Sequence, residues 1–359
     1  MPSQQPSAEG QALIRVLVPG TGTRFRCGGL SVALQTARLL STIRPTQVVT
    51  YRARERDLPF LDDLLREERS SDDGIWLVSW GFDVPGLLRR LRGRRVVYQA
   101  HSSGYGFDLP PGVPVLAVSR NTLGYWGDRA PRNPLFLLPN ALAPMWFARG
   151  DRADRGDAVP SRPVDVLVQE RKSSRYVLNR LVPALREQGL RVEVQSGWVD
   201  DLVGLFNSAQ VVLYDSAQHW RTAGVSEGFG LPPLEAMACG CVVFSSFNHA
   251  LADTLTPGQS AHQIGQGLLS HDVAQIQAAV SDPAAWRLPR QSLEALLAPY
   301  SEAVLRQRWS DTLEALDRLF ARRQQHPDEP FLRSPPLWQE RLRRLSRAVT
   351  RRLRPAPGR

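Results

Sequence analysis

Short apolar runs alternate with amphipathic helical patterns along most of this chain, and this alternation limits the possible folds more than any other feature. The first run, residues 12–18 (Ala-Leu-Ile-Arg-Val-Leu-Val), precedes a helical pattern from Leu30 to about Leu40. Such runs are typical of parallel strands that helices cover on both faces. The order recurs through residues 135–138 and restarts at residue 164. The sequence therefore predicts an α/β protein with two doubly wound parallel sheets.

The same pattern predicts where the individual elements lie. In the first half, apolar runs end at Tyr51, Trp80, Ala100, Ser119 and Leu138, with helical segments near 58–68, 84–93 and 119–127. In the second half we expect strands at 164–168, 190–195, 211–215 and 241–246, and helices at about 174–188 and 199–208. Residues 217–231 are expected to form a loop, which leads into a short helix opened by Pro232 and Pro233.

A charged segment with glycine and proline, residues 148–163, is typical of a domain boundary. We therefore place an N-terminal domain at residues 1–155 and a C-terminal domain at 156–298. An amphipathic helical segment at 299–325 and a basic tail at 326–359 follow. The chain is long enough for two cores, and a cleft between two open sheets is the usual place for a ligand.

The positive charge of the chain is concentrated at one end. The net charge is +10, but residues 331–359 hold nine Arg and one acidic residue, so the remainder is close to neutral. Lys172 is the only lysine. The three cysteines show neither a metal-ligand spacing nor an even disulfide framework, and no long apolar run or signal-like start is present. These features favour a cytoplasmic protein.

Residues 226–241 carry the strongest functional signal. The turn Gly228-Phe229-Gly230-Leu231 precedes the proline-opened helix, whose free N–H groups and positive dipole end favour an anion there. Two carboxylates, Glu227 and Glu235, bracket this turn with seven residues between them. A carboxylate beside an anion site needs hydroxyl or amide donors, which a sugar or a ribose supplies. An ordinary turn with a solvated glutamate at each end is the alternative interpretation.

Strand ends supply further candidates. His101 directly follows the run 95–100 and opens a glycine-containing loop, where a sheet presents catalytic groups; a purely structural histidine is the alternative. Arg171 and Lys172 follow the first strand of the second half. Two cations there would neutralise a diphosphate and stabilise it as a leaving group. A solvated basic pair without a functional role is the alternative interpretation.

Two more loops of the first half point toward the predicted cleft. Cys27-Gly28-Gly29 runs into a helix N-terminus and suits phosphate or sugar hydroxyls, although a turn made only for packing explains the glycines equally well. Asn140 ends the run that leads to the cleft.

The stretch Glu227–Cys241 (Glu-Gly-Phe-Gly-Leu-Pro-Pro-Leu-Glu-Ala-Met-Ala-Cys-Gly-Cys) contains a Glu-x7-Glu motif that resembles the donor-site signature of GT-B-fold retaining glycosyltransferases, of the broad glycosyltransferase family 4 type. Pro139-Asn140-Ala141 resembles the Pro-Asn-Gly segment that closes the first domain of that family. Asn248-His249 stands where the family has glycines. The resemblance implies a GT-B fold, in which two Rossmann-like domains face a cleft and the 299–325 segment crosses back to the first domain.

The resemblance also implies a function. The family transfers a hexose from a nucleotide-diphosphate sugar to a glycan, lipid-linked or small-molecule acceptor, with retention of configuration and without an obligatory metal or other cofactor. Retention there is usually explained by front-side attack, with the departing phosphate as base. The nucleotide base, the sugar, the acceptor, the linkage and the oligomeric state stay open.

By motif match, Glu235 would accept hydrogen bonds from the ribose, Glu227 from the transferred sugar, and the turn N–H groups would meet the phosphates. Beside the diphosphate the match also puts Gly28 and Gly29, and near the sugar it puts His101. The catalytic candidates are therefore Glu227, His101, Lys172 and Arg171. The donor-binding candidates are Glu235, Gly228, Phe229, Gly230, Leu231, Gly28, Gly29 and Asn140.

The tail at 337–354 has an apolar helical stripe among seven arginines, with Trp338 near its start. A basic amphipathic helix of this kind suits an anionic membrane, here the inner face of the plasma membrane. A disordered basic tail and a helix packed on another subunit are the alternatives. Trp338 is the only aromatic residue among the arginines of this segment. Since aromatic side chains are not interleaved with the basic ones, we expect no nucleic-acid partner. A non-catalytic protein that binds nucleotide sugar, or attaches to membrane or nucleic acid on the same scaffold, is the alternative function.

Overall fold

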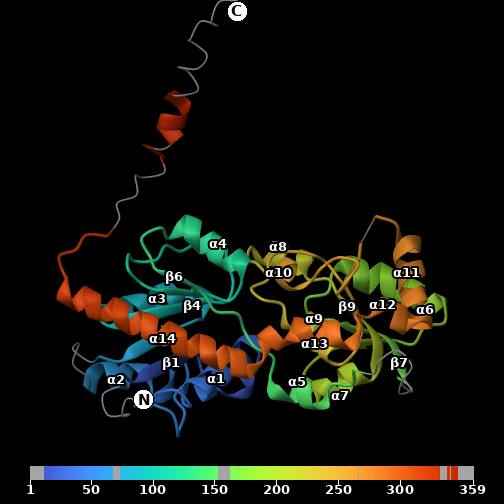
Figure 1. The fold of residues 1–359 in the computed structure, drawn as a ribbon, viewed down its shortest axis with the longest axis horizontal. Coiled ribbons are helices and arrows are strands. Elements are labelled where there is room, and N and C mark those ends of the chain that lie inside the picture. Colours follow the sequence, from blue (N-terminus) through green and yellow to red (C-terminus); the bar gives the residue numbers. More distant parts are fainter. Residues whose placement is uncertain are drawn as a thin grey trace, which may run out of the picture.

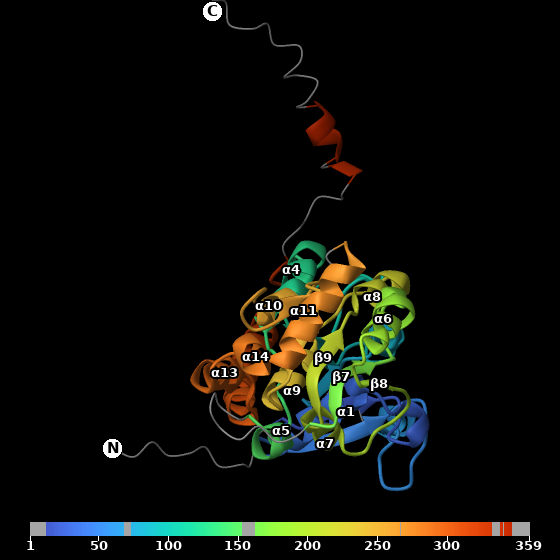
Figure 2. The ribbon, with the colours of Figure 1, turned by 90° about the vertical axis from the view of Figure 1, so that its right-hand side faces the viewer.

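The computed structural model describes residues 12–67, 73–152, 162–265, 267–331, 338–339 and 341–346. These residues form two units, each built on one parallel sheet with helices on both faces (Figure 1). The predicted fold class, α/β with two Rossmann-like domains, is confirmed. Figure 2 turns the second unit toward the viewer.

The first sheet has six parallel strands in the order β2-β1-β3-β4-β5-β6. Most of their side chains are buried apolar groups, which explains why they read as continuous apolar runs. The strands are β1 (Ile14–Val18), β2 (Thr46–Thr50), β3 (Ile75–Val78), β4 (Arg95–Ala100), β5 (Val115–Ala117) and β6 (Leu135–Leu137).

The second sheet has five parallel strands in the order β11-β10-β9-β7-β8. In both sheets the direction of strand succession reverses beside the first strand, between β1 and β3 and between β7 and β9. Ligands of open α/β sheets bind outside the carboxyl ends of the strands at such a switch point. The strands are β7 (Val164–Gln169), β8 (Val192–Gln195), β9 (Ala209–Tyr214), β10 (Val242–Ser245) and β11 (His262–Gln263).

Helices cover both faces of each sheet. On the first sheet, α1 and α14 pack on one face and α2, α3 and α4 on the other. The helices of this unit are α1 (Gly28–Leu40), α2 (Leu61–Glu67), α3 (Val84–Arg90), α4 (Arg120–Arg129) and α14 (Glu302–Gln325), with 3₁₀ turns at Thr23–Phe25 and Gly81–Asp83.

On the second sheet, α7, α9 and α13 pack on one face, joined by α5, and α6 and α11 pack on the other. The helices here are α5 (Pro144–Arg149), α6 (Val182–Glu187), α7 (Leu202–Asn207), α8 (Ala217–Ala223), α9 (Leu231–Ala238), α10 (Leu251–Thr254), α11 (Leu269–Ser281), α12 (Pro283–Trp286) and α13 (Arg290–Leu297), followed by a 3₁₀ turn at Ala298–Tyr300.

The chain crosses between the units twice. The two crossings meet where the Leu142 N–H donates to the Tyr300 carbonyl at 2.8 Å. After the second crossing, α14 lies across the first sheet (Figure 1), as the resemblance implied. Its Leu305, Trp309 and Leu313 side chains are buried there. Helix α14 therefore belongs to the core of the first unit.

One expectation about local structure was wrong. Residues 217–231 were expected to be a loop, but 217–223 form α8, because Ala217, Gln218 and Ala223 favour a helix and Gly224 ends it at a φ of +69°.

The helix expected at about 174–188 is present over residues 175–187, and it contains a wide π-helical turn at Val177–Leu181. Pro183 lies two residues after this turn, and its missing N–H interrupts regular α-helical bonding.

Of the predicted tail helix at 337–354, residues 338–339 and 341–346 are described, and they are helical. Trp338, Leu342 and Leu345 are largely exposed. The rest of that segment and residues 153–161 of the predicted domain boundary lie outside the described residues. Across the described ranges, no helix is both long enough and apolar enough to cross a membrane.

We predict that Leu313→Ala lowers the free energy of unfolding of the first unit by about 2–5 kcal/mol, because it leaves a cavity between α14 and the sheet. Leu313 is 1% exposed. Arg318→Ala on the exposed face of α14 is the matched control and should cost about 0.2–0.5 kcal/mol, since it removes one surface pair with Glu314. Denaturant titration followed by near-ultraviolet circular dichroism measures both. Equal small losses would contradict the packing of α14 on the first unit.

Candidate functional site

The switch point of the second sheet brings a cation and a phenol together. Lys172 follows β7, and Tyr214 is the last residue of the neighbouring strand β9. The Lys172 ammonium donates to the Tyr214 hydroxyl at 3.3 Å. Burial and the nearby Glu227 raise the pKa of Tyr214, so its hydroxyl stays protonated and can act as a donor. This edge is where an open parallel sheet offers a binding site.

The Glu227 carboxylate is buried and held by protein donors. Its Oε2 accepts from the Tyr214 hydroxyl at 2.6 Å and from the Trp220 indole N–H at 2.7 Å. Its Oε1 lies 3.6 Å from the Lys172 ammonium. A buried carboxylate is tolerated only with a counter-charge and hydrogen bonds, and Glu227 has both. Oε2 thus accepts two hydrogen bonds, while Oε1 faces the Lys172 ammonium.

Lys172 is held in an unusual backbone conformation. Its φ is +79°, in the left-handed region that costs a residue with a side chain about 1–2 kcal/mol. Its ammonium lies 4.7 Å from the centre of the Trp220 ring, within cation–π distance. The local contacts therefore overcome the backbone strain and aim the ammonium at Glu227.

Glu235 differs from Glu227 in its surroundings. It lies on α9 and is half-buried, and no hydrogen bond to its carboxylate comes from the residues that the structure describes. Burial raises its pKa to about 7, and only the Lys172 charge opposes that rise. Both glutamates therefore interact with Lys172, Glu227 as its ion-pair partner and Glu235 at longer range.

The turn between the two glutamates requires glycine at two positions. Gly230 precedes α9 at a φ of +83°, and a Cβ on it would lie 2.3 Å from Leu251. A Cβ on Gly228 would lie 1.4 Å from the His101 carbonyl oxygen. Phe229, between them, is buried against the Tyr300 ring. The turn is therefore packed rigidly from both sides.

The start of α9 offers few backbone donors. The helix begins at Leu231, one residue before the predicted start at Pro232, and Pro232 and Pro233 carry no N–H. The N–H groups of Phe229, Gly230 and Leu231 are consequently the ones that this turn can present to an anion.

Three serines join the His101 loop to the Glu227 loop. The Ser102 hydroxyl donates to the Ser226 carbonyl at 2.6 Å, and the Ser226 N–H donates to the Ser103 carbonyl at 3.2 Å. The Ser103 N–H donates to the Ser226 hydroxyl at 3.0 Å. Residues from β4 of the first unit and from the second unit thus form one polar contact.

His101 lies at this contact with an unused ring nitrogen. Its Nε2 is buried and has no hydrogen-bond partner among the described residues. Burial lowers the pKa of His101 to about 4, so the ring is neutral at neutral pH. A neutral imidazole can accept or donate one hydrogen bond at this nitrogen, depending on its tautomer.

The structure does not bring every candidate into this cluster. Arg171 is exposed and forms no ion pair with the described residues. Gly28 and Gly29 open α1, and a Cβ on Gly28 would meet nothing within 4 Å. Asn140 is buried in the loop after β6. No described hydrogen bond or ion pair joins these four residues to Glu227 or Glu235. The catalytic role of Arg171 and the donor-binding roles of Gly28, Gly29 and Asn140 stay predictions.

Three residues of the cluster were missed in the sequence. Tyr214 ends a predicted strand, so the rule that singled out His101 could have found it. Trp220 was hidden in a supposed loop. His249 has a φ of +52°, and its Nδ1 accepts from the Glu227 N–H at 3.2 Å, which supports the turn from behind. Its only signal was its place where the resembled family has glycine.

Metal-ligating side chains do not cluster in the described part of the chain: no group of three or more His, Cys, Asp or Glu there could hold an ion.

Comparisons with known proteins relate this chain to glycosyltransferases in sequence and in fold. The family model "Glycosyl transferases group 1" matches residues 186–284, which include both glutamates but not Lys172 or His101. Sucrose-phosphate synthase from Thermosynechococcus elongatus has 15% identity and a TM-score of 0.61 over 86% of this chain and 100% of its own. A glycosyltransferase from Rickettsia africae has 10% identity and a TM-score of 0.60 over 87% and 99%. Anabaena HepE, in complex with UDP-glucose, has 15% identity and a TM-score of 0.56 over 85% and 100%.

The chain has the GT-B fold. No curated protein sequence is similar enough to this chain to add to these matches. The two units correspond to the paired Rossmann-like domains of GT-B glycosyltransferases, and the fold predicted from the Glu-x7-Glu motif is confirmed. In this GT-B protein, Lys172 and the two glutamates lie at the switch point of the second sheet.

We predict that Glu235→Gln changes how stability depends on pH. The folded pKa of about 7 lies above the ordinary 4.5, so the folded state binds the proton more tightly. The wild type therefore loses stability as pH rises between these values, whereas the Gln variant has no proton to lose there. Urea denaturation below, within and above this window should show the variant gaining stability relative to the wild type. Glu187→Gln on α6 controls for the substitution, and parallel curves for all three proteins would contradict the raised pKa.

Proposed function

We propose that this GT-B protein is a retaining glycosyltransferase that moves a hexose from a nucleotide-diphosphate sugar to a glycan, lipid-linked or small-molecule acceptor. One observation carries the proposal: at the switch point of the sheet, Lys172 pairs with Glu227, whose Oε2 is held by Tyr214 and Trp220, and also interacts with Glu235, whose carboxylate accepts no hydrogen bond from the described residues. The family match over residues 186–284 supports it. The UDP-glucose complex of Anabaena HepE supports a nucleotide sugar as the donor class.

The donor's nucleotide would be recognised by Glu235. Its carboxylate accepts no hydrogen bond from the described part of the chain, and the two ribose hydroxyls would supply hydrogen bonds when it is ionised. The diphosphate would then lie at the turn before α9, where the N–H groups of residues 229–231 and the Lys172 ammonium supply positive charge. This charge supports a mechanism without an obligatory metal.

The transferred sugar would lie between Glu227 and His101. Oε1 of Glu227 can accept from a sugar hydroxyl while Tyr214 and Trp220 hold Oε2 in place. The buried Nε2 of His101 would find its missing partner in another hydroxyl. Binding of donor would thus satisfy polar groups that the free protein leaves open.

Catalysis would come from stabilising the departing diphosphate. Negative charge grows on that group as the glycosidic bond breaks, and Lys172 and the turn N–H groups are fixed beside it before the reaction begins. In front-side attack the departing phosphate takes the proton of the acceptor hydroxyl. No protein nucleophile is required, and both the broken and the formed bond lie on one face of the sugar.

The acceptor would enter from the first unit, which faces the donor across the serine contact. For a lipid-linked acceptor, the basic tail would hold the protein at an anionic membrane, on the cytoplasmic face. The exposed Trp338, Leu342 and Leu345 on the described part of the tail helix support this role.

A donor screen tests the proposal directly. Thermal shift with UDP-, GDP- and ADP-sugars should identify one preferred nucleotide, and the matching sugar should be hydrolysed slowly even without acceptor. A donor that binds without any turnover would favour the non-catalytic alternative. No binding to any member of the panel would refute both.

We predict that Glu235→Ala weakens binding of the preferred nucleotide by about 1–3 kcal/mol, because hydrogen bonds to a charged acceptor are lost. Isothermal titration calorimetry measures the dissociation constant. Glu187→Ala, an exposed glutamate on α6, should leave it unchanged. An unchanged constant for Glu235→Ala would remove Glu235 from the nucleotide site.

We predict that Lys172→Ala lowers turnover on the order of 10²–10³-fold, with a much smaller loss of stability, because it removes charge stabilisation of the leaving group. Arg171→Ala is the matched control at the next position, and its exposed side chain predicts a far smaller effect. Initial rates and thermal melting are compared for both. Parallel losses of activity and melting temperature in Lys172→Ala would indicate a structural role instead.

A further inference from the structure

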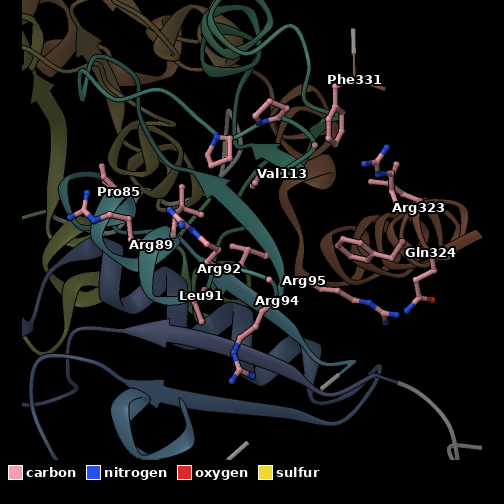
Figure 3. Close-up of a pocket in the computed structure, with 18 of the residues that line it drawn as sticks. Pro85, Arg89, Leu91, Arg92, Arg94, Arg95, Val113, Arg323, Gln324 and Phe331 are labelled. Carbon is pink, nitrogen blue, oxygen red and sulfur yellow. The ribbon is translucent and has the colours of Figure 1, made fainter. Parts of the chain in front are cut away.

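A second concave region lies away from the proposed donor site. A groove of about 860 Å³ opens between α3 with its following loop, the start of β4 and the last turns of α14 (Figure 3). We call it the arginine groove, because Arg89, Arg92, Arg94, Arg95 and Arg323 line it. Its volume is within the range of about 300–1,000 Å³ that is usual for small-molecule sites.

Part of this positive charge is uncompensated. The acidic residues that line the groove are Asp73, which pairs with Arg95 at 2.8 Å, and Asp108, which pairs with Arg129 at 3.2 Å. Arg89, Arg92 and Arg323 form no ion pair with any of the described residues. Figure 3 shows Arg89 and Arg92 on the α3 side and Arg323 on the α14 side. Arg89 and Arg92 thus border the groove without a protein anion among the described residues. Arg323 donates to the Glu329 carbonyl at 2.9 Å, and after the hydrogen bond from Arg322 its charge also contributes to lowering the pKa of Glu329.

The α14 side of the groove has a fixed aromatic wall. The Phe331 ring lies 4.1 Å from the Arg323 guanidinium and packs on Gly112, where an added Cβ would come within 2.3 Å of the ring. Leu319 and Phe320 continue this wall. The groove therefore combines apolar surface with guanidinium groups, and the contacts with Arg323 and Gly112 position the Phe331 ring in its wall.

The groove and the donor site lie at opposite edges of the first sheet. Arg95 begins β4, and His101 follows its last residue, Ala100. Six residues of strand at about 3.3 Å each separate the two edges by about 20 Å. A ligand in the groove would not compete with a sugar beside His101.

We propose that the arginine groove binds a phosphate group of an anionic ligand that also carries apolar surface. The planar fork of a guanidinium matches two phosphate oxygens, and Arg89 or Arg92 on the α3 side and Arg323 on the α14 side can approach one phosphate from two sides. The apolar wall contacts the remainder of the ligand. A soluble diphosphate compound and the headgroup of an anionic lipid share this chemistry, and the experiment separates them.

The test uses two full-length proteins in a Lys172→Ala background, which weakens pyrophosphate binding at the proposed donor site equally in both. The groove variant is Arg89→Gln, Arg92→Gln and Arg323→Gln. The matched control removes three exposed positive charges elsewhere, with Arg56→Gln, Arg180→Gln and Arg318→Gln. One arm titrates inorganic pyrophosphate by calorimetry. The other measures sedimentation with vesicles of phosphatidylglycerol and phosphatidylcholine in equal parts.

In at least one arm, the groove variant should bind roughly tenfold or more weakly than the control, as expected for loss of a charge-assisted hydrogen bond. A difference with pyrophosphate identifies a soluble phosphate ligand, and a difference with vesicles alone identifies a lipid headgroup. Equal affinities of the two proteins in both arms, or no binding in either arm, would overturn the proposal.

A second variant covers the case in which the triple substitution fails to fold. Phe331→Ala removes the aromatic wall at a half-buried position and keeps every arginine. In the same arm it should weaken pyrophosphate binding relative to the control, because Arg323 loses the ring beside its guanidinium, or vesicle binding, because an apolar contact is also lost. Unchanged binding of this variant in both arms would equally refute the groove. Binding of nucleotide sugars is measured separately, in the protein that retains Lys172. A negative result for the arginine groove therefore leaves the proposed function standing.

Discussion

The site depends on the close approach of two backbone segments from different units. Gly228 lies against the His101 carbonyl so closely that no side chain fits at position 228, and three serines hydrogen-bond across the same contact. This contact sets the distance between the strand-end histidine of the first sheet and the Glu227 turn of the second. The relative position of the two sheets therefore determines how far His101 lies from Glu227. A movement of one unit against the other would change the geometry of the site.

Around that contact, charge is distributed unequally between two glutamates. Glu227 accepts hydrogen bonds from the Tyr214 phenol and the Trp220 indole and pairs with the Lys172 ammonium. Glu235 is affected only by the more distant charge of Lys172, and its raised pKa makes it harder to ionise. Seven residues separate the two carboxylates in the sequence, but their surroundings differ enough to suit different roles. The strained Lys172 backbone is consistent with selection for that ammonium position rather than for stability.

Much of this could be predicted from sequence because strands buried on both faces leave an apolar signature, and because strand ends collect at one edge. Lys172 and His101 were found by that rule, and Glu227 by its place in the turn before α9. Trp220 was not found, because α8 is short and its residues were interpreted as part of the 217–231 loop. His249 acts through its backbone angle and one ring nitrogen, which no spacing reveals. The arginine groove joins residues near position 90 to residues beyond 318, and only the course of α14 brings them together.

That course of α14 has a consequence for how the chain folds. The first sheet is synthesised first, yet Leu305, Trp309 and Leu313, which complete one of its faces, are among the last residues of the two units to emerge. During synthesis α1 covers part of this face, and the part that α14 completes stays open while the second unit is made. The first unit therefore gains its final stability only after α14 has been synthesised, which is later than the strands of the second sheet.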